Sequence, residues 1–416
     1  MASEWRQVQL GDVAGLMTGY PFKSQHYTDD VDAPRLIGGD NIAQGNLRWD
    51  SVRRWPRNMT SDLKDYWLAL GDIVLAMDRP WIETGLKRAV VGPQDVPSLL
   101  IQRTARLRGT NELDTAFLRY VVGSQAFTQY ILSVQTGTAI PHISSAQIRA
   151  FRFSLPPLDE QRAIAETLGA LDDRIDDLRQ TNATLEAIAA ALFKSWFVDF
   201  DGVSAEAMQE SELGMIPKGW AIRSLDSIAD YLNGLALQKF PPESETEFLP
   251  VIKIAQLRAG HTNGADKASA QLRPAYIVED GDVLFSWSGS LEVEMWTGGR
   301  GALNQHLFKV TSREVPKWFY YFATRQHLPD FRAIAAGKAT TMGHIQRGHL
   351  TAARVAVPPP NEMAKFDAII APLLEKTINN ALQARNLATL RDTLLPRLIS
   401  GKLRIKAAER MTEAVA

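Results

Sequence analysis

The sequence has no cysteine among its 416 residues. Disulfide bonds, thiolate catalysis and cysteine-based zinc sites are therefore excluded, and a reducing compartment is expected. There is no run of 18 uninterrupted apolar residues, and the first residues form neither a secretory leader nor an organelle-targeting pattern. We therefore expect a soluble, untargeted protein that works in the cytoplasm.

Sequence motifs of catalysis are missing as well. None of the 28 glycines lies in a dinucleotide-binding or phosphate-binding loop, and there is no NPPY or DPPY tetrapeptide of the methyltransferase type. The seven histidines form no H-x-x-x-H pair. Adjacent acids such as Asp172 and Asp173 point roughly 100° apart on a helix, so we interpret them as a solvated face. We expect no catalytic centre, no metal site and no cofactor bound by this chain.

Composition indicates a globular protein of two or three domains, since 45% of the residues are apolar and 22% are charged. The formal net charge of −1 does not favour a nucleic-acid partner. The basic residues of the N-terminal part are nevertheless bunched in residues 53–57, 86–88 and 103–108. Such clusters can form a basic face on one side of a domain. The alternative is ordinary solvated surface charge.

A long segment of the chain occurs twice. At an offset of 202 residues, His142-Ile143 matches His344-Ile345, Pro156-Pro157 matches Pro358-Pro359, and Glu160 matches Glu362. Nearer the start of each copy the offset drifts, because Gly71–Leu75 matches Gly281–Phe285, and insertions in loops explain this drift. A period near two hundred residues is too long for a solenoid. We infer a tandem duplication of one domain followed by one helix.

Each copy predicts an α+β domain. Short β-rich runs broken by Gly, Pro, Asn and Asp predict strands at residues 35–42, 71–77 and 88–92, and again at 249–257, 281–287 and 306–310. Residues 114–134 and 316–335 follow these strands and predict one helix in each domain.

The double prolines are followed by long helices. In the first helix, apolar residues step by four and three from Ile164 to Trp196, with Asn182 as a polar residue on this heptad seam. The second helix, about 361–400, places Thr377, Asn380 and Arg391 on its seam, so its middle is less regular. Two such helices can pair antiparallel about a pseudo-twofold axis. The alternative is that each helix packs only on its own domain, and Asn182 is either a register device or a local defect.

Polar loops of the two domains supply candidate DNA contacts. Arginine suits guanine, glutamine suits adenine, and serine or threonine suits either phosphate or base, although each residue could also be an ordinary surface group. The candidates in the first copy are Arg53, Arg54, Arg57, Arg79, Lys87, Arg88, Gln135, Thr138 and His142. Those in the second copy are Lys253, Gln256, Arg258, Trp287, Ser288, Ser290, Lys338, Thr340, Thr341 and His344.

Four stretches together carry a resemblance that covers nearly the whole chain. They are LPPLDEQRAIAETLGALDDRID with ALFKSWFVDF behind it, SELGMIPKGWAIRSLDSIA, EDGDVLFSWSGS and LRDTLLPRLISGKLRI. In this combination the chain resembles the specificity subunit of type I restriction-modification enzymes. The resemblance implies target recognition domains at residues 1–156 and 203–357, spacer helices at 157–202 and 358–405, and a tail at 406–416.

The same resemblance implies a function in DNA recognition. Each recognition domain would read one half of a bipartite, asymmetric double-stranded DNA target, and the helices, each about 60 Å long for about 40 residues, would set the gap. Two methyltransferase subunits would dock along the helices, flip an adenine and methylate it from S-adenosylmethionine bound on those partners, and restriction subunits would join them. Candidate docking residues are Glu160, Gln161, Trp196, Phe197 and Glu362.

One departure and two rival functions accompany this resemblance. Met363 stands where the first copy has Gln161, which puts the second docking surface in doubt. The chain could instead be a scaffold or inhibitor that binds the methyltransferase subunits without reading DNA. It could also be a fragment of a single-chain restriction-modification enzyme.

Overall fold

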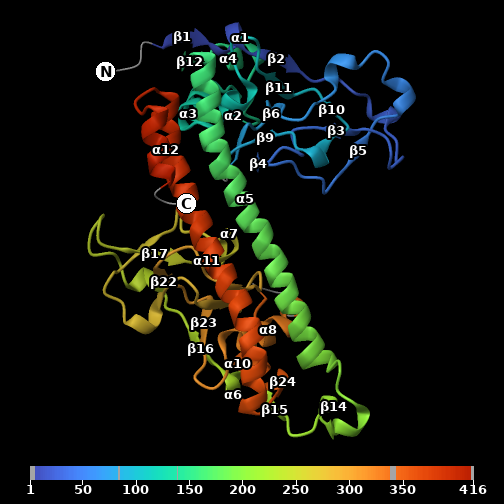
Figure 1. Ribbon diagram of the computed structural model, residues 1–416, viewed down its shortest axis with the longest axis vertical. Coiled ribbons are helices and arrows are strands. Elements are labelled where there is room, and N and C mark those ends of the chain that lie inside the picture. The colour runs from blue at the N-terminus through green and yellow to red at the C-terminus, as the bar shows by residue number, and fades with distance from the viewer. Residues whose placement is uncertain (1–4, 83–84, 138, 338–342, 414–416) are drawn as a thin grey trace. The chain divides into compact units, whose positions relative to one another are not determined.

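The computed structural model describes residues 5–82, 85–137, 139–337 and 343–413 (Figure 1). The chain divides into a first unit, Met1–Asp173 with Leu387–Ala416, and a second unit, Arg174–Asn386. Each unit therefore contains one copy of the repeat and a part of both long helices, α5 (Leu158–Lys194) and α11 (Pro360–Ile399). No helix in the described ranges is long and apolar enough to cross a membrane.

The first unit is built around a five-stranded sheet. Its strands run in the order β2 (Gly15–Thr18), β11 (Thr104–Arg108), β6 (Ile73–Ala76), β9 (Arg88–Val90) and β4 (Gln44–Gly45). A smaller sheet has the order β10 (Ser98–Leu100), β3 (Arg35–Ile37) and β5 (Arg53–Arg54). Two further strand pairs are β1 (Arg6–Gln9) with β12 (Arg152–Leu155) and β7 (Trp81–Ile82) with β8 (Gly85–Leu86). Its other helices are α1 (Leu10–Val13), α2 (Thr115–Gly123), α3 (Gln125–Val134), α4 (Ser145–Arg149) and α12 (Ile405–Glu413). Strand β6 is buried along its whole length and forms the centre of this core.

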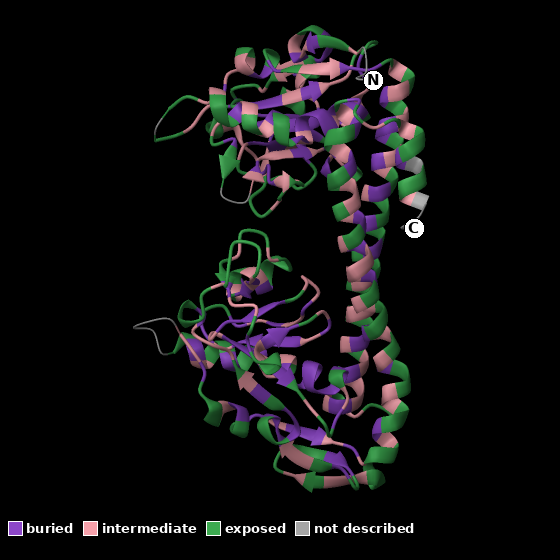
Figure 2. Ribbon diagram, turned by 90° about the vertical axis from the view of Figure 1, so that its left-hand side faces the viewer, coloured by how far each residue is buried: buried purple, intermediate pink, exposed green. Residues whose placement is uncertain are grey.

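The second unit repeats the arrangement. Its main sheet has the order β16 (Asp230–Asn233), β23 (Leu307–Thr311), β20 (Val283–Ser286) and β21 (Val293–Met295). A second sheet has the order β18 (Lys267–Ala268), β17 (Leu249–Ile252), β22 (Gly301–Leu303) and β19 (Ile277–Val278). The remaining strand pairs are β13 (Met208–Ser211) with β14 (Gly214–Pro217) and β15 (Ala221–Ser224) with β24 (Arg354–Val357). Its helices are α6 (Leu225–Ile228), α7 (Ile254–Ala259), α8 (Lys317–Gln326), α9 (Leu328–Ala336) and α10 (Arg347–Ala352). In both units the buried residues gather in the sheets and on the inward faces of the helices (Figure 2).

Four local predictions need correction. Residues 114–134 form two helices and not one, because Ser124 ends α2 and its hydroxyl accepts the amide hydrogen of Phe127 to cap α3. Residues 316–335 are likewise broken at His327, with Pro329 in the first turn of α9. The predicted strand at 249–257 ends at Ile252 and continues as helix α7. Helix α12 lies where the sequence suggested only a tail.

The two long helices pack antiparallel in each unit. In the second unit Asn182 donates to the carbonyl of Thr377 at 2.8 Å, while the Trp196 ring, just beyond α5, lies 5.0 Å from the Phe366 ring. In the first unit Arg391 donates to Asp172 at 2.8 Å. In the second unit the residue numbers fall along α11 as they rise along α5, which is the antiparallel sense. The predicted helix pair is confirmed, and the alternative in which each helix packs only on its own domain is excluded.

Asn182 has a specific partner on the seam. Asn380, which is 2% exposed, donates from its amide to Asn182 Oδ1 at 2.9 Å. Of the polar side chains on the second seam, that of Asn380 is therefore paired with Asn182. This pairing supports the interpretation of Asn182 as a register device, because any shifted register would bury unpaired amides.

We expect Asn182→Ala to lower the unfolding free energy by about 1–3 kcal/mol, because the buried Asn380 amide would lose its side-chain partner. Urea denaturation of the full-length chain measures this loss. Thr184→Ala is the control, since Thr184 is exposed and bonds only within its own helix. The double variant Asn182→Leu/Asn380→Leu should recover most of the loss, and a double variant less stable than the single one would contradict the assignment.

Candidate nucleic-acid interface

Three segments of the first unit meet at the end of strand β6. The Met77 amide donates to the Arg103 carbonyl at 2.9 Å, and the Ile143 amide donates to the Met77 carbonyl at 2.9 Å. The Arg79 amide donates to the Pro141 carbonyl at 2.6 Å. Backbone bonds therefore join the loop after β6 to the segment before α4, two of the loops in which the sequence placed candidate residues. We call residues 77–79, 103 and 141–143 the first loop junction.

The second unit forms the same junction with the same backbone bonds. The Trp287 amide donates to the His306 carbonyl at 3.3 Å, and the Ile345 amide donates to the Trp287 carbonyl at 3.0 Å. The Gly289 amide donates to the Gly343 carbonyl at 2.9 Å. We call residues 287–289, 306 and 343–345 the second loop junction. The duplication has thus preserved the backbone frame of this surface in both copies.

The side chains on the two frames differ. In the first junction Asp78 accepts from Arg103 at 2.9 Å and lies 2.5 Å from Nδ1 of His142. In the second junction Ser288, the counterpart of Asp78, lies 2.9 Å from Nδ1 of His306. A carboxylate beside a guanidinium and an imidazole is thereby replaced by a hydroxyl beside an imidazole. The two surfaces therefore offer different donors and acceptors on one frame.

An indole distinguishes the second junction further. Trp287 donates from Nε1 to Asn233 at 3.0 Å and to the Gln305 carbonyl at 3.1 Å. Its ring centre lies 6.1 Å from that of His344, and the two rings are nearly perpendicular. Three of the candidate residues, Trp287, Ser288 and His344, are therefore brought together.

Three basic side chains lie near one another beside the first junction, together with the carboxylates of Asp40 and Asp78. Burial lowers the pKa of the Lys87 ammonium, Asp40 opposes that change, and Arg79 and Arg48 add to it. The Lys87 amide also donates to the Pro80 carbonyl at 2.7 Å, which ties strand β9 to the loop that carries Arg79. Lys87, Arg48 and Arg79 therefore make a basic neighbourhood of the kind that attracts phosphate.

Several other candidates are engaged in contacts within their own unit. Arg54 donates to the Ala33 carbonyl at 2.7 Å, Arg57 donates to the Asp32 carbonyl at 2.6 Å, and Arg53 pairs with Asp40. Lys253 pairs with Asp266, its amide donates to Gln256 at 3.3 Å, and the Ser290 carbonyl accepts from Ser286 at 2.6 Å. These residues brace loops, and only Arg258 in this group projects as an exposed side chain without a described partner.

Gln135 lies at the end of α3, and its side-chain oxygen is buried without a hydrogen-bond partner in the described part of the chain. The candidates Thr138, Lys338, Thr340 and Thr341 lie outside the described residues.

Arg88 faces away from Lys87, because successive residues of a strand point to opposite faces of the sheet. Burial lowers the pKa of its guanidinium, the negative charge of Asp172 opposes this change, and Arg119 and Arg391 reinforce it. Arg88 therefore belongs to a charged cluster at the helix pair and not to the loop junction. The alternation of side-chain direction along a strand, with Ala89 buried, could have indicated that Lys87 and Arg88 point to different faces.

Asp172 is the centre of that cluster. It accepts from the Tyr120 hydroxyl at 2.7 Å, from Arg119 at 3.0 Å and from Arg391 at 2.8 Å. The prediction that Asp172 belongs to a solvated face was wrong, because its cationic partners come from α2 and α11, which the local sequence does not reveal.

The structure gives Gln161 an internal role in place of the expected partner contact. Gln161 is 0% exposed and accepts from the Asp114 amide at 2.8 Å. Its amide donates to the carbonyls of Glu112 and Pro156, both at 2.9 Å. These three hydrogen bonds fix the start of α5 to its own domain. Met363 occupies the matching position in the second unit and is buried among apolar side chains, which explains the departure at this position.

The other expected docking residues also have partners within their own unit. Phe197 is 5% exposed in an aromatic cluster with Trp220 and Phe366, and Trp196 packs on Phe366. Glu362 accepts from the Trp220 indole at 2.9 Å, and Glu160 accepts from Arg404 at 3.1 Å. These contacts anchor the helix ends to the domains.

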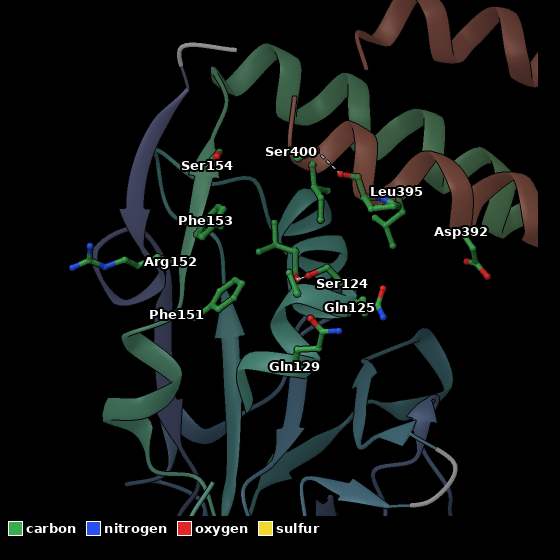
Figure 3. Close-up of a pocket in the computed structure, with 15 residues that line it drawn as sticks. Ser124, Gln125, Gln129, Phe151, Arg152, Phe153, Ser154, Asp392, Leu395 and Ser400 are labelled. Carbon is green, nitrogen blue, oxygen red and sulfur yellow. Dashed lines mark hydrogen bonds between the residues drawn. The ribbon is translucent and has the colours of Figure 1, made fainter. Parts of the chain in front are cut away.

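A groove of about 580 Å³ lies in the first unit between α3, β12 and the C-terminal part of α11 (Figure 3). Phe151, Phe153 and Leu395 form part of its lining. Its hydroxyls are engaged locally, since Ser124 donates to the Val121 carbonyl and Ser400 to that of Pro396. Within the described ranges no group of three or more His, Cys, Asp or Glu residues is placed to hold a metal ion. The exposed surface of the groove is mainly apolar.

Comparison with known proteins identifies the frame that carries the two junctions. Residues 2–187 and 217–391 match the family described as "Type I restriction modification DNA specificity domain". The chain belongs to this family. It is a DNA specificity subunit of a type I restriction-modification complex, and such subunits are non-catalytic.

Individual relatives agree with this assignment. The specificity subunit is 26% identical to the MjaIX specificity subunit of Methanocaldococcus jannaschii, over 70% of this chain and 69% of that protein. It is 23% identical to the HindI specificity subunit of Haemophilus influenzae, over 96% of this chain and 100% of that protein. The crystal structure of the type I S subunit from M. genitalium has the same fold, with a TM-score of 0.54 at 16% identity over 95% of this chain and 96% of that one.

Proposed function

We propose that the two loop junctions read the two halves of a bipartite, asymmetric DNA target. The recognition domains would comprise residues 1–156 and 203–357, and the helical segments 157–202 and 358–405 would set the gap between the half-sites, with 406–416 as a tail. The observation that carries this proposal is the identical set of backbone hydrogen bonds at the two junctions, on which Asp78 and Arg103 are replaced by Ser288 and His306. Duplicated frames with different side chains suit two different half-sites.

The partners of this function would be two methyltransferase subunits, and restriction subunits would join them. The methyltransferase subunits would dock along the helices, bind S-adenosylmethionine themselves and methylate a flipped adenine. Ile188 on α5 and Ile369 on α11 support a docking surface there, because their side chains are 45% and 50% exposed. Exposed apolar residues on paired helices offer contact area to another protein.

Sequencing of methylated bases tests the proposal. Cells that express this subunit with its methyltransferase partner should show methylation within two short motifs at one fixed gap. Removing four facing residues from each long helix shortens it by roughly 6 Å. The gap should then shrink by one or two base pairs, since base pairs rise by about 3.4 Å. A single undivided motif, or an unchanged gap in the shortened variant, would refute the proposal.

A further inference from the structure

The turn after the central strand differs between the two junctions in one informative way. Gly289 has φ +66°, and Arg79, which makes the matching backbone bond in the first junction, has φ +44°. Glycine is the default residue in this left-handed region because it has no Cβ. An L-residue with a side chain is sterically disfavoured there, and Pro80 narrows the backbone choices of Arg79 further.

A second residue of the same junction is strained in the same way. Arg103, whose carbonyl accepts from Met77, has φ +64°. Among the described residues, three that are not glycine have positive φ, and two of them are Arg79 and Arg103. Strained backbone persists where the surroundings enforce it, and it concentrates at functional sites.

The strained backbone of Arg79 carries an exposed side chain. Its guanidinium makes no hydrogen bond or ion pair within the described part of the chain, whereas that of Arg103 pairs with Asp78. Its backbone is held by the bond from its amide to Pro141 and by the bond from Lys87 to Pro80. A free guanidinium on a fixed backbone is a preorganised donor in a basic neighbourhood.

We propose that Arg79 is the specificity-determining residue of the first junction and that it recognises a guanine in the half-site read by the first domain. Arginine presents two parallel N–H donors that match O6 and N7 of guanine in the major groove. Gly289 offers no such donor, so the half-site read by the second domain lacks a counterpart of this contact. This inference rests on the proposed function. It assigns the recognition of one base, a guanine, to one residue, Arg79.

Two measurements test this inference. One is the thermal stability of the full chain, and the other is the DNA motif in which methylation is found. Arg79→Gly should raise the midpoint of thermal unfolding by roughly 2–4 °C, because it relieves the strained turn. It should also reduce the preference for guanine at one position of one half-site by about 10- to 100-fold. Arg79→Lys should keep much of the overall DNA affinity but weaken the guanine preference, because an ammonium on a flexible stem lacks the rigid planar fork of the guanidinium. Gly289→Arg, the reciprocal control, should lower the thermal midpoint.

Different failures have different meanings. A half-site without guanine, or an Arg79→Gly variant with the parental motif, would overturn the assignment while leaving the bipartite target intact. A variant that loses both stability and recognition in both half-sites would show Arg79 to be structural. A parental protein without any bipartite motif would overturn the proposed function together with this inference.

Discussion

Replacing Asp172 with alanine is expected to lower the unfolding free energy of the first unit by about 3 kcal/mol. Asp172 accepts from Tyr120, Arg119 and Arg391, and its charge also offsets the burial of Arg88. Its removal leaves the buried Arg88 guanidinium without a compensating carboxylate, and Arg391 retains only its bond to the more exposed Asp392. An uncompensated buried charge costs more than the intact pair contributes, which is why the expected effect is large.

Denaturant unfolding of the full-length chain measures this effect, with Asp177→Ala as the control. Asp177 lies on the same helix but is exposed and forms no ion pair among the described residues, so its loss should change stability by less than about 0.5 kcal/mol. Adding Arg88→Met to Asp172→Ala should recover part of the loss, because one uncompensated charge disappears. A change in Asp172→Ala no larger than in the control would disprove the role of this cluster.

The long helices could be predicted because their signals are local. The double prolines, the N-terminal acids and the heptad spacing all lie within each segment, and the duplication revealed that both segments belong to one type of element. The pairing of Asn182 with Asn380 was also within reach, since each is a polar residue on its own seam. The breaks at Ser124 and His327 were missed because a capping serine and a first-turn proline are compatible with either one helix or two.

The candidate site was harder to predict because it depends on partners distant in sequence. Lys87 and Arg88 are neighbours in one basic cluster, yet their side chains point to opposite faces of the sheet. Lys87 points toward the loop junction and Arg88 toward Asp172. Gln161 follows the double proline and Glu160 of the first copy, and only its three bonds within the domain explain its presence. The sequence placed candidate residues in loops of both copies, and the tertiary structure decided which of these loops meet and which side chains remain available.

The second large effect concerns Glu294 on strand β21. Burial raises the pKa of its carboxyl from 4.5 to about 7, Arg325 opposes this shift, and Glu186 and Glu292 add to it. Arg325 is already engaged by Glu186, which also accepts from the Tyr321 hydroxyl at 3.0 Å. Glu294 therefore faces a cation that is largely neutralised, and its own negative charge is poorly compensated.

The sign of the pH dependence follows from this shift. The folded state binds the Glu294 proton more tightly than the unfolded state does, so the stabilising contribution is fully present below about pH 4.5 and is lost as the pH rises to about 7. At about 1.4 kcal/mol for each pKa unit, the loss amounts to roughly 3 kcal/mol. Glu294→Gln should remove this dependence, and it should stabilise the protein by up to about 3 kcal/mol at pH 8 but by little near pH 5.

Urea unfolding of parent and variant at both pH values measures the difference. Glu279→Gln is the matched control, because the Glu279 side chain is 58% exposed and pairs with Arg300 at the surface. That control should show similar stability to the parent at both pH values. If Glu294→Gln gave the same stability change at pH 5 and pH 8, the Glu294 carboxyl would not titrate in this interval. The charges of Glu186, Glu294 and Arg325 would then have to be distributed differently within the cluster.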